Sequence, residues 1–237
     1  MGPEASGGRI MSALVWLGIT IIAYLGALAF ARRVNGHPLA NPVLVASIPV
    51  IVLMLATDTP HEVYQEGGAW LLALLGPATV ALAIPLFRNW PKVRAAAGPL
   101  FLAIGAGSAT AVATALGTAW ALGAEMQTLL SLAPKSVTTP IAMGIAQTTS
   151  GLPLLAAAIV IVTGVIGAVI GPWLLSRVGV VDPEAHGVAL GTAAHGIGTA
   201  RAFQEGEETG TFSGVAMGVN GIATALLLPW LLIWLFG

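Results

Sequence analysis

The sequence contains no cysteine, and charged residues fill only 8% of its 237 positions. The absence of cysteine excludes disulfide bonds and metal sites built from thiolates. The 9 basic and 10 acidic residues nearly balance, so no excess of positive charge attracts nucleic acid, and no nucleic-acid partner is expected. Soluble domains carry about 25% charged residues, far more than this chain. The composition therefore argues against a soluble globular protein.

Apolar residues take the place of the missing charge. Hydrophobic residues make up 57% of the sequence, and the mean hydropathy is +0.90. A helix that spans a bilayer needs about 20 mostly apolar residues. Such runs lie at 11–31, 41–57, 68–87, 98–122, 152–175, 186–203 and 211–236. We therefore predict an all-α fold, a polytopic transmembrane helix bundle embedded in the lipid bilayer as a multi-pass protein of the cell (inner) membrane.

The first apolar run is longer than the apolar core of a signal peptide, and it ends directly at Arg32 and Arg33. Basic residues in this position are typical of the end of a retained transmembrane helix. We therefore predict that residues 1–33 form an N-terminal transmembrane helix and that residues 34–237 form the main membrane domain.

Segment 134–151 is shorter and more polar than the other runs. Pro134 and Pro140 prevent one continuous helix through it. Thr139 followed by Pro140 predicts the start of a short helix, with Thr139 as the N-cap. The positive end of that helix would face three polar residues, Lys135, Ser136 and Thr138. Amides, hydroxyls and an ammonium would then converge on a site for an anion. The alternative, that Lys135 extends from an ordinary loop to the interface, stays open.

A second polar motif runs from His195 to Arg201. The two glycines that follow His195 predict a loosened helix that a ligand can approach, and Thr199 would cap the helix where it resumes. Arg201 would then bind a carboxylate through two hydrogen bonds, unless it only pairs with Glu205 one turn later. His195 has three open roles: hydrogen-bond donor, proton carrier with an unperturbed pKa of about 6.5, or a residue of helix packing.

Asn220 lies among glycines in the last run and could line the same path, as could Ser108, although small polar residues also hold membrane helices together. No pattern of a nucleophile with a base, and no cluster of metal ligands, is present. We therefore predict no enzyme, no cofactor and no bound metal. The predicted substrate-binding residues are Lys135, Ser136, Thr138, Thr139, His195, Thr199, Arg201 and Asn220.

The basic residues predict the orientation, because cytoplasmic loops are rich in Lys and Arg. Arg32, Arg33 and the basic stretch 88–94 flank an acidic loop at 58–66, so the N-terminus is expected outside. If 134–151 enters the membrane without crossing it, Arg177 falls inside and the acidic stretch 205–208 outside. This count predicts a cytoplasmic C-terminus.

Short blocks of small residues recur in the two halves of the chain. Leu75–Ala83 is similar to Leu190–Gly198, and Ala103–Ser108 to Ala216–Gly221. We predict two repeats, 41–122 and 134–236, with opposite orientations in the membrane, an arrangement common in transporters. The packing of small residues between membrane helices would produce a similar pattern, and this alternative stays open.

The two polar motifs also resemble a known family. Pro134–Ala142 and Gly191–Ala202 look like the two signature stretches of the LrgB/CidB family, and Leu75–Leu86 and Ala216–Gly221 are similar to further family blocks. The family comprises antiholin-like LrgB proteins and is related to the plastid glycolate/glycerate translocator. The resemblance extends from Asn41 to the C-terminus.

This resemblance implies one of two functions. The first is a transporter of a small organic carboxylate, similar to glycolate, glycerate or pyruvate, with proton coupling left open. The second is an antiholin-like regulator of murein hydrolase export and autolysis. The resemblance also implies a small membrane partner of the LrgA type, and a homo-oligomer is left open. A lysis pore would not need lysine, hydroxyls and prolines at membrane depth, so the motifs favour transport.

Overall fold

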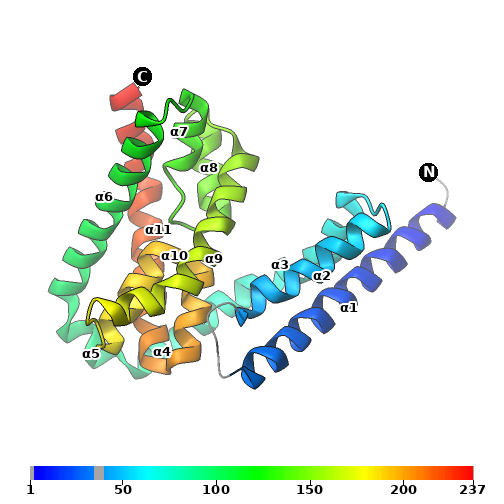
Figure 1. Cartoon of the computed structure of the whole chain (residues 1–237), viewed down its shortest axis with the longest axis horizontal. Coiled ribbons are helices and arrows are strands. Elements are labelled where there is room, and N and C mark those ends of the chain that lie inside the picture. Colours follow the sequence, from blue (N-terminus) through cyan, green and yellow to red (C-terminus); the bar gives the residue numbers. More distant parts are fainter. Residues whose placement is uncertain (1–2, 35–39, 237) are drawn as a thin grey trace. The chain divides into compact units, whose positions relative to one another are not determined.

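The computed structural model describes residues 3–34 and 40–236, and all regular structure among them is helical (Figure 1). The predicted all-α fold is confirmed, as is its character of a polytopic bundle with broken helices. The chain forms two compact units, Met1–Ala83 and Ile84–Gly237. The predicted division at residue 33 and the two predicted repeats stay predictions, and residues 1 and 2 of the first predicted helix lie outside the described residues.

The first unit consists of α1 (Pro3–Arg33), α2 (Pro42–Ala56) and α3 (His61–Ala81), and α1 packs against both others. Asn41 caps α2, because its Oδ1 accepts hydrogen bonds from the backbone amides of Val43 and Leu44 in the first turn of the helix. A Cβ at Gly67 would collide with the carbonyl oxygen of Ala13, so α1 and α3 approach closely at this glycine. Trp16 and Tyr64 add an edge-to-face ring contact with centroids 5.9 Å apart.

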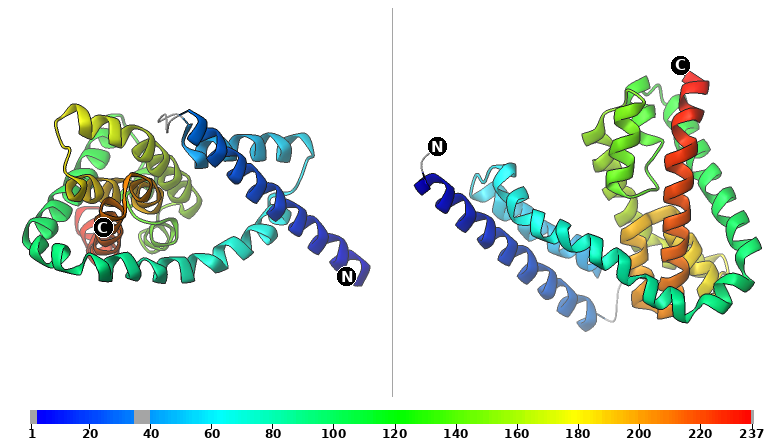
Figure 2. Two further views of the ribbon diagram at one scale, coloured as in Figure 1. Left: turned by 90° about the horizontal axis from the view of Figure 1, so that it is seen from below. Right: turned by 180° about the vertical axis from the view of Figure 1, so that it is seen from behind.

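The second unit carries both polar motifs. Its long apolar helices are α6 (Ala97–Ala121), α9 (Pro153–Arg177) and α11 (Glu207–Phe236). The shorter helices are α4 (Ala83–Arg88), α5 (Trp90–Ala95), α7 (Met126–Leu132) and α8 (Thr139–Thr148). The remaining helix, α10 (Pro183–Glu205), is longer but polar. Both views of Figure 2 show α6 and α11 side by side within this unit.

Five of the seven predicted spans correspond to helices that are long and apolar enough to cross a membrane: Met11–Arg33, His61–Arg88, Ala97–Ala121, Pro153–Arg177 and Glu207–Phe236. The predicted span 41–57 forms α2, which has 15 residues. At 1.5 Å per residue this helix is only about 22 Å long, shorter than the hydrocarbon core of about 30 Å.

The predicted span 186–203 is wrong, because α10 reverses direction in its middle. His195 has φ 42° and ψ −132°, which no helix contains. Beyond it the chain folds back, and Nδ1 of His186 lies 3.1 Å from Oε2 of Glu205. Nineteen residues of straight helix would separate these two positions by about 28 Å. Residues 183–194 and 196–205 are therefore two antiparallel arms, which we call hairpin 2, with His195 at the tip.

Glycine allows the arms of hairpin 2 and their neighbours to pack this closely. A Cβ at Gly198 would strike the carbonyl oxygen of Leu190 in the opposite arm. A Cβ at Gly191 would strike the carbonyl oxygen of Ser213 in α11. Because both obstacles are backbone atoms, no side-chain rearrangement would relieve them. Small residues between membrane helices commonly serve this purpose.

The segment around 134–151 forms a second break in the membrane domain. The chain leaves α7, passes through residues 133–138, which include Pro134, and returns as α8. We call α7, residues 133–138 and α8 hairpin 1. The 10 residues of α8 extend only about 15 Å, half of the hydrocarbon core. After α8, Ser150 with φ 62° reverses the chain into α9. The dimensions agree with the predicted entry of this segment into the membrane without crossing.

Ion pairs show which ends of the second unit share a face. Lys92 Nζ lies 2.6 Å from Glu208 Oε1, and Arg88 lies 3.6 Å from Glu207. The hydrogen bond from Lys92 to Glu208 raises the pKa of Lys92. The acidic start of α11 therefore lies on the same face as the basic residues, and not on the opposite face as predicted. The prediction failed because hairpin 2 returns to the face from which it starts.

This arrangement also overturns the predicted cytoplasmic C-terminus. Since α11 starts beside Arg88 and Lys92 and is 30 residues long, its far end lies at the other face, near α7 in Figure 1. Gly237 itself lies outside the described residues. The basic face should be cytoplasmic because short loops rich in Lys and Arg stay inside. Hairpin 2 thus enters from the basic face and hairpin 1 from the opposite one.

We expect that the end of α11 is accessible only from the face opposite to Lys92. The chain has no native cysteine, so single-cysteine variants can be labelled at one position only. Phe236→Cys should react with a membrane-impermeant thiol reagent applied to intact cells from outside, whereas Arg94→Cys in α5 should react only after the cells are permeabilised. Equal labelling of both variants in intact cells would contradict this topology.

Candidate functional site

The tips of the two hairpins meet at the side chain of Asn220. Its Nδ2 donates to the carbonyl of Ser136 in hairpin 1 at 3.0 Å and to the carbonyl of Thr192 in hairpin 2 at 3.2 Å. Its Oδ1 accepts hydrogen bonds from Ser108 of α6 at 2.5 Å and from Thr224 at 3.3 Å. Asn220 is only 2% exposed. One amide therefore connects the two broken elements to two of the long helices.

The local sequence explains why these carbonyls need such a partner. A helical carbonyl normally bonds the amide four residues later, and for Thr192 that amide belongs to Gly196, beyond the break at His195. Ser136 lies in the non-helical segment before α8. Backbone carbonyls buried at membrane depth must find a partner inside the protein. The amide group of Asn220 supplies both hydrogens.

Lys135 brings a positive charge to the same tip. Its Nζ donates to Ser136 Oγ at 3.1 Å, and the side chain is half-buried. Among the side chains that the structure describes, no carboxylate lies within ion-pairing distance of this ammonium. Lys135 is also close enough to His195 for the two groups to interact electrostatically. A lysine without a carboxylate partner among the described side chains thus lies at the tip of hairpin 1.

The helix α8 begins four residues after this lysine, and its cap differs from the predicted one by one residue. Thr138 is the N-cap, and Thr139 and Pro140 are the first two helical residues. Among the residues that the structure describes, no side chain accepts a hydrogen bond from the first free amides of α8. Because these amides have no partner within the helix, the positive end of α8 remains available to an anion.

His195 is buried at the tip of hairpin 2 and is oriented by α9. Its Nε2 donates to the carbonyl of Val160 at 3.0 Å, and the residue is 4% exposed. The ring lies directly against Gly164, where a Cβ would come within 2.7 Å of Cε1. Only glycine leaves room for the imidazole at this level of α9. The break occurs at His195 itself, and not at the two following glycines as the sequence suggested.

Thr199 does not cap the second arm of hairpin 2. Its Oγ1 donates to the carbonyl of His195, four residues earlier, at 2.9 Å, and lies 3.0 Å from the hydroxyl of Ser213. The predicted capping role is therefore wrong, and Thr199 instead fixes the backbone of the tip and attaches the second arm to α11. Whether its hydroxyl also contacts a substrate stays a prediction.

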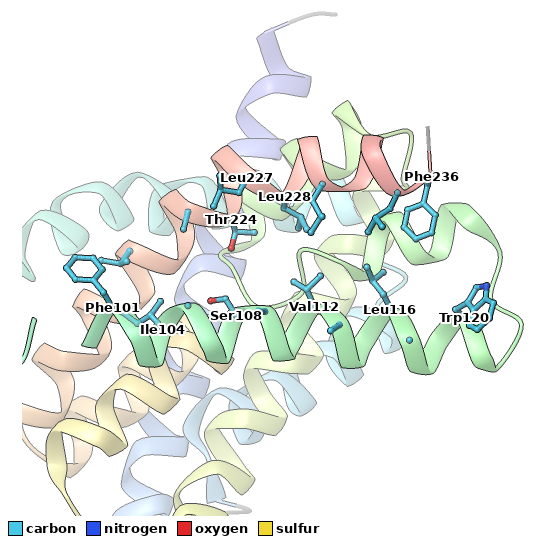
Figure 3. A pocket seen from close by; sticks show the side chains of 18 residues that line it. Phe101, Ile104, Ser108, Val112, Leu116, Trp120, Thr224, Leu227, Leu228 and Phe236 are labelled. Atoms are coloured by element: carbon cyan, nitrogen blue, oxygen red, sulfur yellow. The ribbon is translucent and has the colours of Figure 1, made fainter. Parts of the chain in front are cut away.

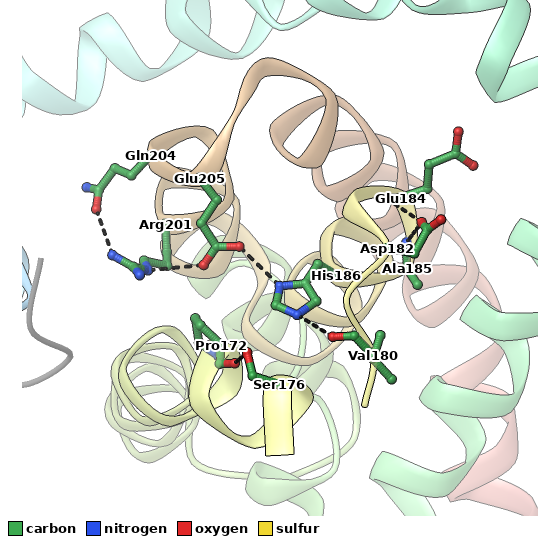
Figure 4. A network of polar contacts seen from close by, with 10 residues as sticks. All are labelled: Pro172, Ser176, Val180, Asp182, Glu184, Ala185, His186, Arg201, Gln204 and Glu205. Carbon is green, nitrogen blue, oxygen red and sulfur yellow. Dashed lines mark hydrogen bonds and ion pairs between the residues drawn. The ribbon is translucent and has the colours of Figure 1, made fainter. Parts of the chain in front are cut away.

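Arg201 takes part in a polar network at the basic face (Figure 4). Its Nε lies 3.4 Å from Oε1 of Glu205, and that carboxylate also pairs with His186. The second ring nitrogen of His186 donates to the carbonyl of Val180 at 2.9 Å. The ion pair with Glu205 is the alternative that the sequence left open. Arg201 lies six residues beyond the tip, about 9 Å along the arm, so its contact with a substrate stays a prediction.

A groove of about 780 Å³ lies between α6 and α11, lined almost entirely by apolar side chains (Figure 3). Its two hydroxyls, Ser108 and Thr224, both donate to Asn220 and are therefore already paired. The groove consequently offers little hydrogen bonding to a polar ligand.

Sequence reasoning did not identify Thr192 as a site residue. Its carbonyl binds Asn220, while its buried hydroxyl has no hydrogen-bond partner among the described residues. Thr192 lies three residues before the second polar motif, within the stretch Gly191–Ala202 that resembles the LrgB/CidB family, and its position in that stretch was the available signal. The structure thus brings Lys135, Ser136, Asn220 and His195 together with Thr192.

The chain is similar to known proteins over almost its whole length. The model of the LrgB-like family matches residues 20–234. YwbG, an uncharacterized protein of Bacillus subtilis, is 39% identical over 221 residues, which are 92% of this chain and 97% of YwbG. The holin-like protein CidB of Staphylococcus epidermidis is 29% identical over 223 residues, 94% of this chain and 97% of CidB. No solved structure matches the chain. The resemblance of the two polar motifs is therefore confirmed, and the chain, a multi-pass membrane protein, belongs to the LrgB-like family.

Proposed function

We propose that the chain transports a small organic carboxylate, similar to glycolate, glycerate or pyruvate, across the inner cell membrane. The observation that carries this proposal is the meeting of two opposed hairpin tips at Asn220, next to Lys135, which has no carboxylate partner among the described side chains. Charged groups within a bilayer are expensive to bury and usually mark a functional site.

Helix ends support the choice of an anion. Both α8 and the second arm of hairpin 2 start at the tips, so the positive ends of two half-helices point toward the middle of the membrane. Together with Lys135 they form a site that one carboxylate would neutralise. Half-helices that direct their amino ends at an anionic substrate are a recurrent feature of transporters.

The two hairpins enter from opposite faces, and this arrangement supports transport rather than simple binding of a ligand. Hairpin 1 reaches the cluster from one face and hairpin 2 from the other, and Asn220 connects the two tips. A movement of either hairpin would open the cluster to one side only. Alternating access requires a gate on each side of a central site.

A second candidate function is an antiholin-like regulator of murein hydrolase export and autolysis. It is favoured by a specific observation, the name holin-like protein carried by the CidB relatives. A small membrane partner of the LrgA type and a homo-oligomer belong to both proposals. Proteoliposomes separate the two functions, because a transporter shows saturable uptake of carboxylates, whereas a protein that only regulates murein hydrolase export shows none.

The central test is uptake of labelled glycolate, glycerate and pyruvate into proteoliposomes, with and without an LrgA-type partner. We expect saturable uptake that falls at least about tenfold in Lys135→Gln, since a charge-assisted hydrogen bond contributes about 1.5–3 kcal/mol. The matched control is Arg94→Gln, which removes one positive charge from α5 and should leave uptake unchanged. Undiminished uptake by Lys135→Gln would contradict the proposed anion site. Absence of saturable uptake in the wild type would favour the regulator.

A further inference from the structure

A polar network at the basic face lies apart from the anion site at the hairpin tips. His186 lies near the start of the first arm of hairpin 2, and both of its ring nitrogens have a partner (Figure 4). Nδ1 lies 3.1 Å from Oε2 of Glu205, and Nε2 lies 2.9 Å from the carbonyl oxygen of Val180. The side chains of His186 and Glu205 are both mostly buried. Water would therefore not fully replace either contact if it were lost.

Both partners of this ring are hydrogen-bond acceptors. A carbonyl oxygen carries no hydrogen, and an ionised carboxylate only accepts. A neutral imidazole has a single N–H, so it donates to one of the two oxygens and directs a lone pair at the other. Both contacts are satisfied together only when the pair of His186 and Glu205 holds one proton more than a neutral imidazole and an ionised carboxylate.

The guanidinium of Arg201 indicates where the additional proton lies. Its Nε is 3.4 Å from Oε1, the other oxygen of Glu205. A guanidinium is always charged in proteins, and a cation in contact with a carboxylate favours the ionised form. The additional proton is therefore located on the imidazole of His186. A carboxylate between two cations then connects the two arms at the base of hairpin 2, by which we mean residues 180–186 and 201–206.

The other charged residues of hairpin 2 and of the helices packed against it have partners of their own: Arg177, Asp182, Glu184, Glu207 and Glu208. Arg177 of α9 lies over the ring of Trp173, and Asp182 caps α10. Lys92 interacts electrostatically with Glu184 and pairs with Glu208, while Arg88 pairs with Glu207. The residues of α6 carry no charge. Glu205 and Arg201 are thus the charged groups in the network of His186.

His186 joins the two ends of hairpin 2. Val180 lies in the turn that leads from α9 into the first arm, and Glu205 is the last residue of the second arm. One imidazole therefore holds the entry, the first arm and the exit of the hairpin together. Glycines stand on both sides of this contact, Gly179 with φ 79° and Gly206 between the second arm and α11. Residues at the ends of such elements commonly act as hinges, so a hairpin that moves as a gate would pivot here.

We propose that His186 and Glu205 form a proton-binding site that holds hairpin 2 closed at the basic face. Release of the proton from the imidazole to water replaces one hydrogen bond by a contact between two lone pairs, which loosens the base of the hairpin. By reciprocity, opening of the hairpin releases the proton. This inference rests on the proposed transport function, in which hairpin 2 is a gate. The site is distinct from His195, which lies nine residues later, at the tip.

Nuclear magnetic resonance of the ring nitrogens tests the proton site without any transport. The chain has four histidines, so isotope-labelled histidine gives few signals, and His186→Gln identifies those of His186. At neutral pH the ratio of imidazolium to neutral His186 should fall at least about tenfold in Glu205→Gln, since an adjacent opposite charge favours the charged form by about one to three pH units. Glu207→Gln is the matched control, because it removes a carboxylate that pairs with Arg88 and should leave the ratio unchanged. Equal ratios in the wild type and Glu205→Gln would overturn the site.

Thiol labelling tests whether the proton holds the hairpin closed. Ser213 of α11 is fully buried against the arms of hairpin 2, beside Gly191 and the hydroxyl of Thr199, and Ser213→Cys keeps nearly the same shape. Arg94→Cys, exposed at the basic face, corrects for the effect of pH on the thiol itself. With an impermeant reagent at that face, the rate of Ser213→Cys relative to Arg94→Cys should rise at least about fivefold from about pH 6 to about pH 8, the range in which histidine loses its proton. In the background of His186→Gln the relative rate should stay constant. An equal rise in that background, or no reaction at either pH, would overturn the link between proton release and opening.

The uptake assay distinguishes failure of this inference from failure of the proposed function. Absence of saturable uptake in the wild type, together with the expected fall of the imidazolium ratio in Glu205→Gln, would keep the proton site and reject transport. Saturable uptake with equal ratios in the two proteins would instead keep transport and reject the proton site.

Discussion

Replacing Asn220 by alanine is expected to abolish uptake and to lower the stability of the membrane domain. The change leaves the carbonyls of Ser136 and Thr192 and the hydroxyl of Ser108 without their partner. Each buried polar group left unpaired costs about 1–3 kcal/mol, so the summed loss exceeds the effect of an ordinary substitution. The midpoint of thermal unfolding in detergent, followed by tryptophan fluorescence, and uptake into proteoliposomes measure the two effects.

Two variants of matched size distinguish the hydrogen bonds from the volume of the side chain. Asn220→Asp keeps the shape but has no amide hydrogens for the two carbonyls, so it should be as harmful as Asn220→Ala. Ser108→Ala removes only one donor to Asn220 and should cost about 1 kcal/mol. Full uptake and an unchanged unfolding midpoint in Asn220→Asp would show that the connection between the hairpin tips is unimportant.

Several features of the fold could be predicted because they depend on local sequence. The long apolar helices follow from hydropathy, since a helix that satisfies its own backbone is what an apolar run forms in lipid. The break before α8 follows from Pro134 and Pro140, because proline removes a helical hydrogen bond. The start of α8 shortly after Lys135 follows from the same prolines.

The reversal in α10 could not be predicted, because distant residues stabilise it. The run 186–203 has the length of a span, and its glycines indicate only a loosened helix. The sharp turn at His195 is held by the carbonyl of Val160 in α9, and the close approach of the arms to α11 requires Gly191 beside Ser213. None of these contacts is visible in the local pattern.

The error at α10 led to the other errors of the site. Counting it as a span placed the acidic stretch 205–208 outside, although Glu207 and Glu208 pair with basic residues of α4 and α5. It also placed Thr199 and Arg201 at the start of a resumed helix, although the second arm begins at residue 196. A single arginine, Arg177, decided the count, and one charge is a weak determinant of topology.

The roles of Asn220 and Thr192 also could not be predicted from the sequence. Asn220 was predicted as a residue of the substrate path, yet its four hydrogen bonds all lie within the protein. Thr192 was overlooked, yet it has the buried hydroxyl that remains unpaired. Sequence identifies polar residues at membrane depth, but only the packing determines which of them is already satisfied.

Replacing Gly164 by alanine is expected to reduce proton-driven uptake about thirtyfold through its effect on His195. The new Cβ would lie 2.7 Å from Cε1 and 2.8 Å from Nε2 of the ring, closer than such atoms approach. The imidazole must therefore move and lose its hydrogen bond to Val160, a loss of about 2 kcal/mol that corresponds to this factor. Uptake of glycolate driven by an inward proton gradient measures the effect. Gly218→Ala is the matched control, since its Cβ would have no neighbour within 4 Å.

A double-mutant cycle identifies the ring as the target of this change. In His195→Ala the atoms that the new Cβ would meet are absent, apart from the end of Ile197, so adding Gly164→Ala should cause little further loss. If His195 also carries the coupled proton, His195→Ala should still exchange glycolate down its gradient but should not accumulate it when only a proton gradient is applied. Accumulation by His195→Ala would exclude that role. An equal loss from Gly164→Ala in both backgrounds would show that α9 acts on the site by a route other than the imidazole.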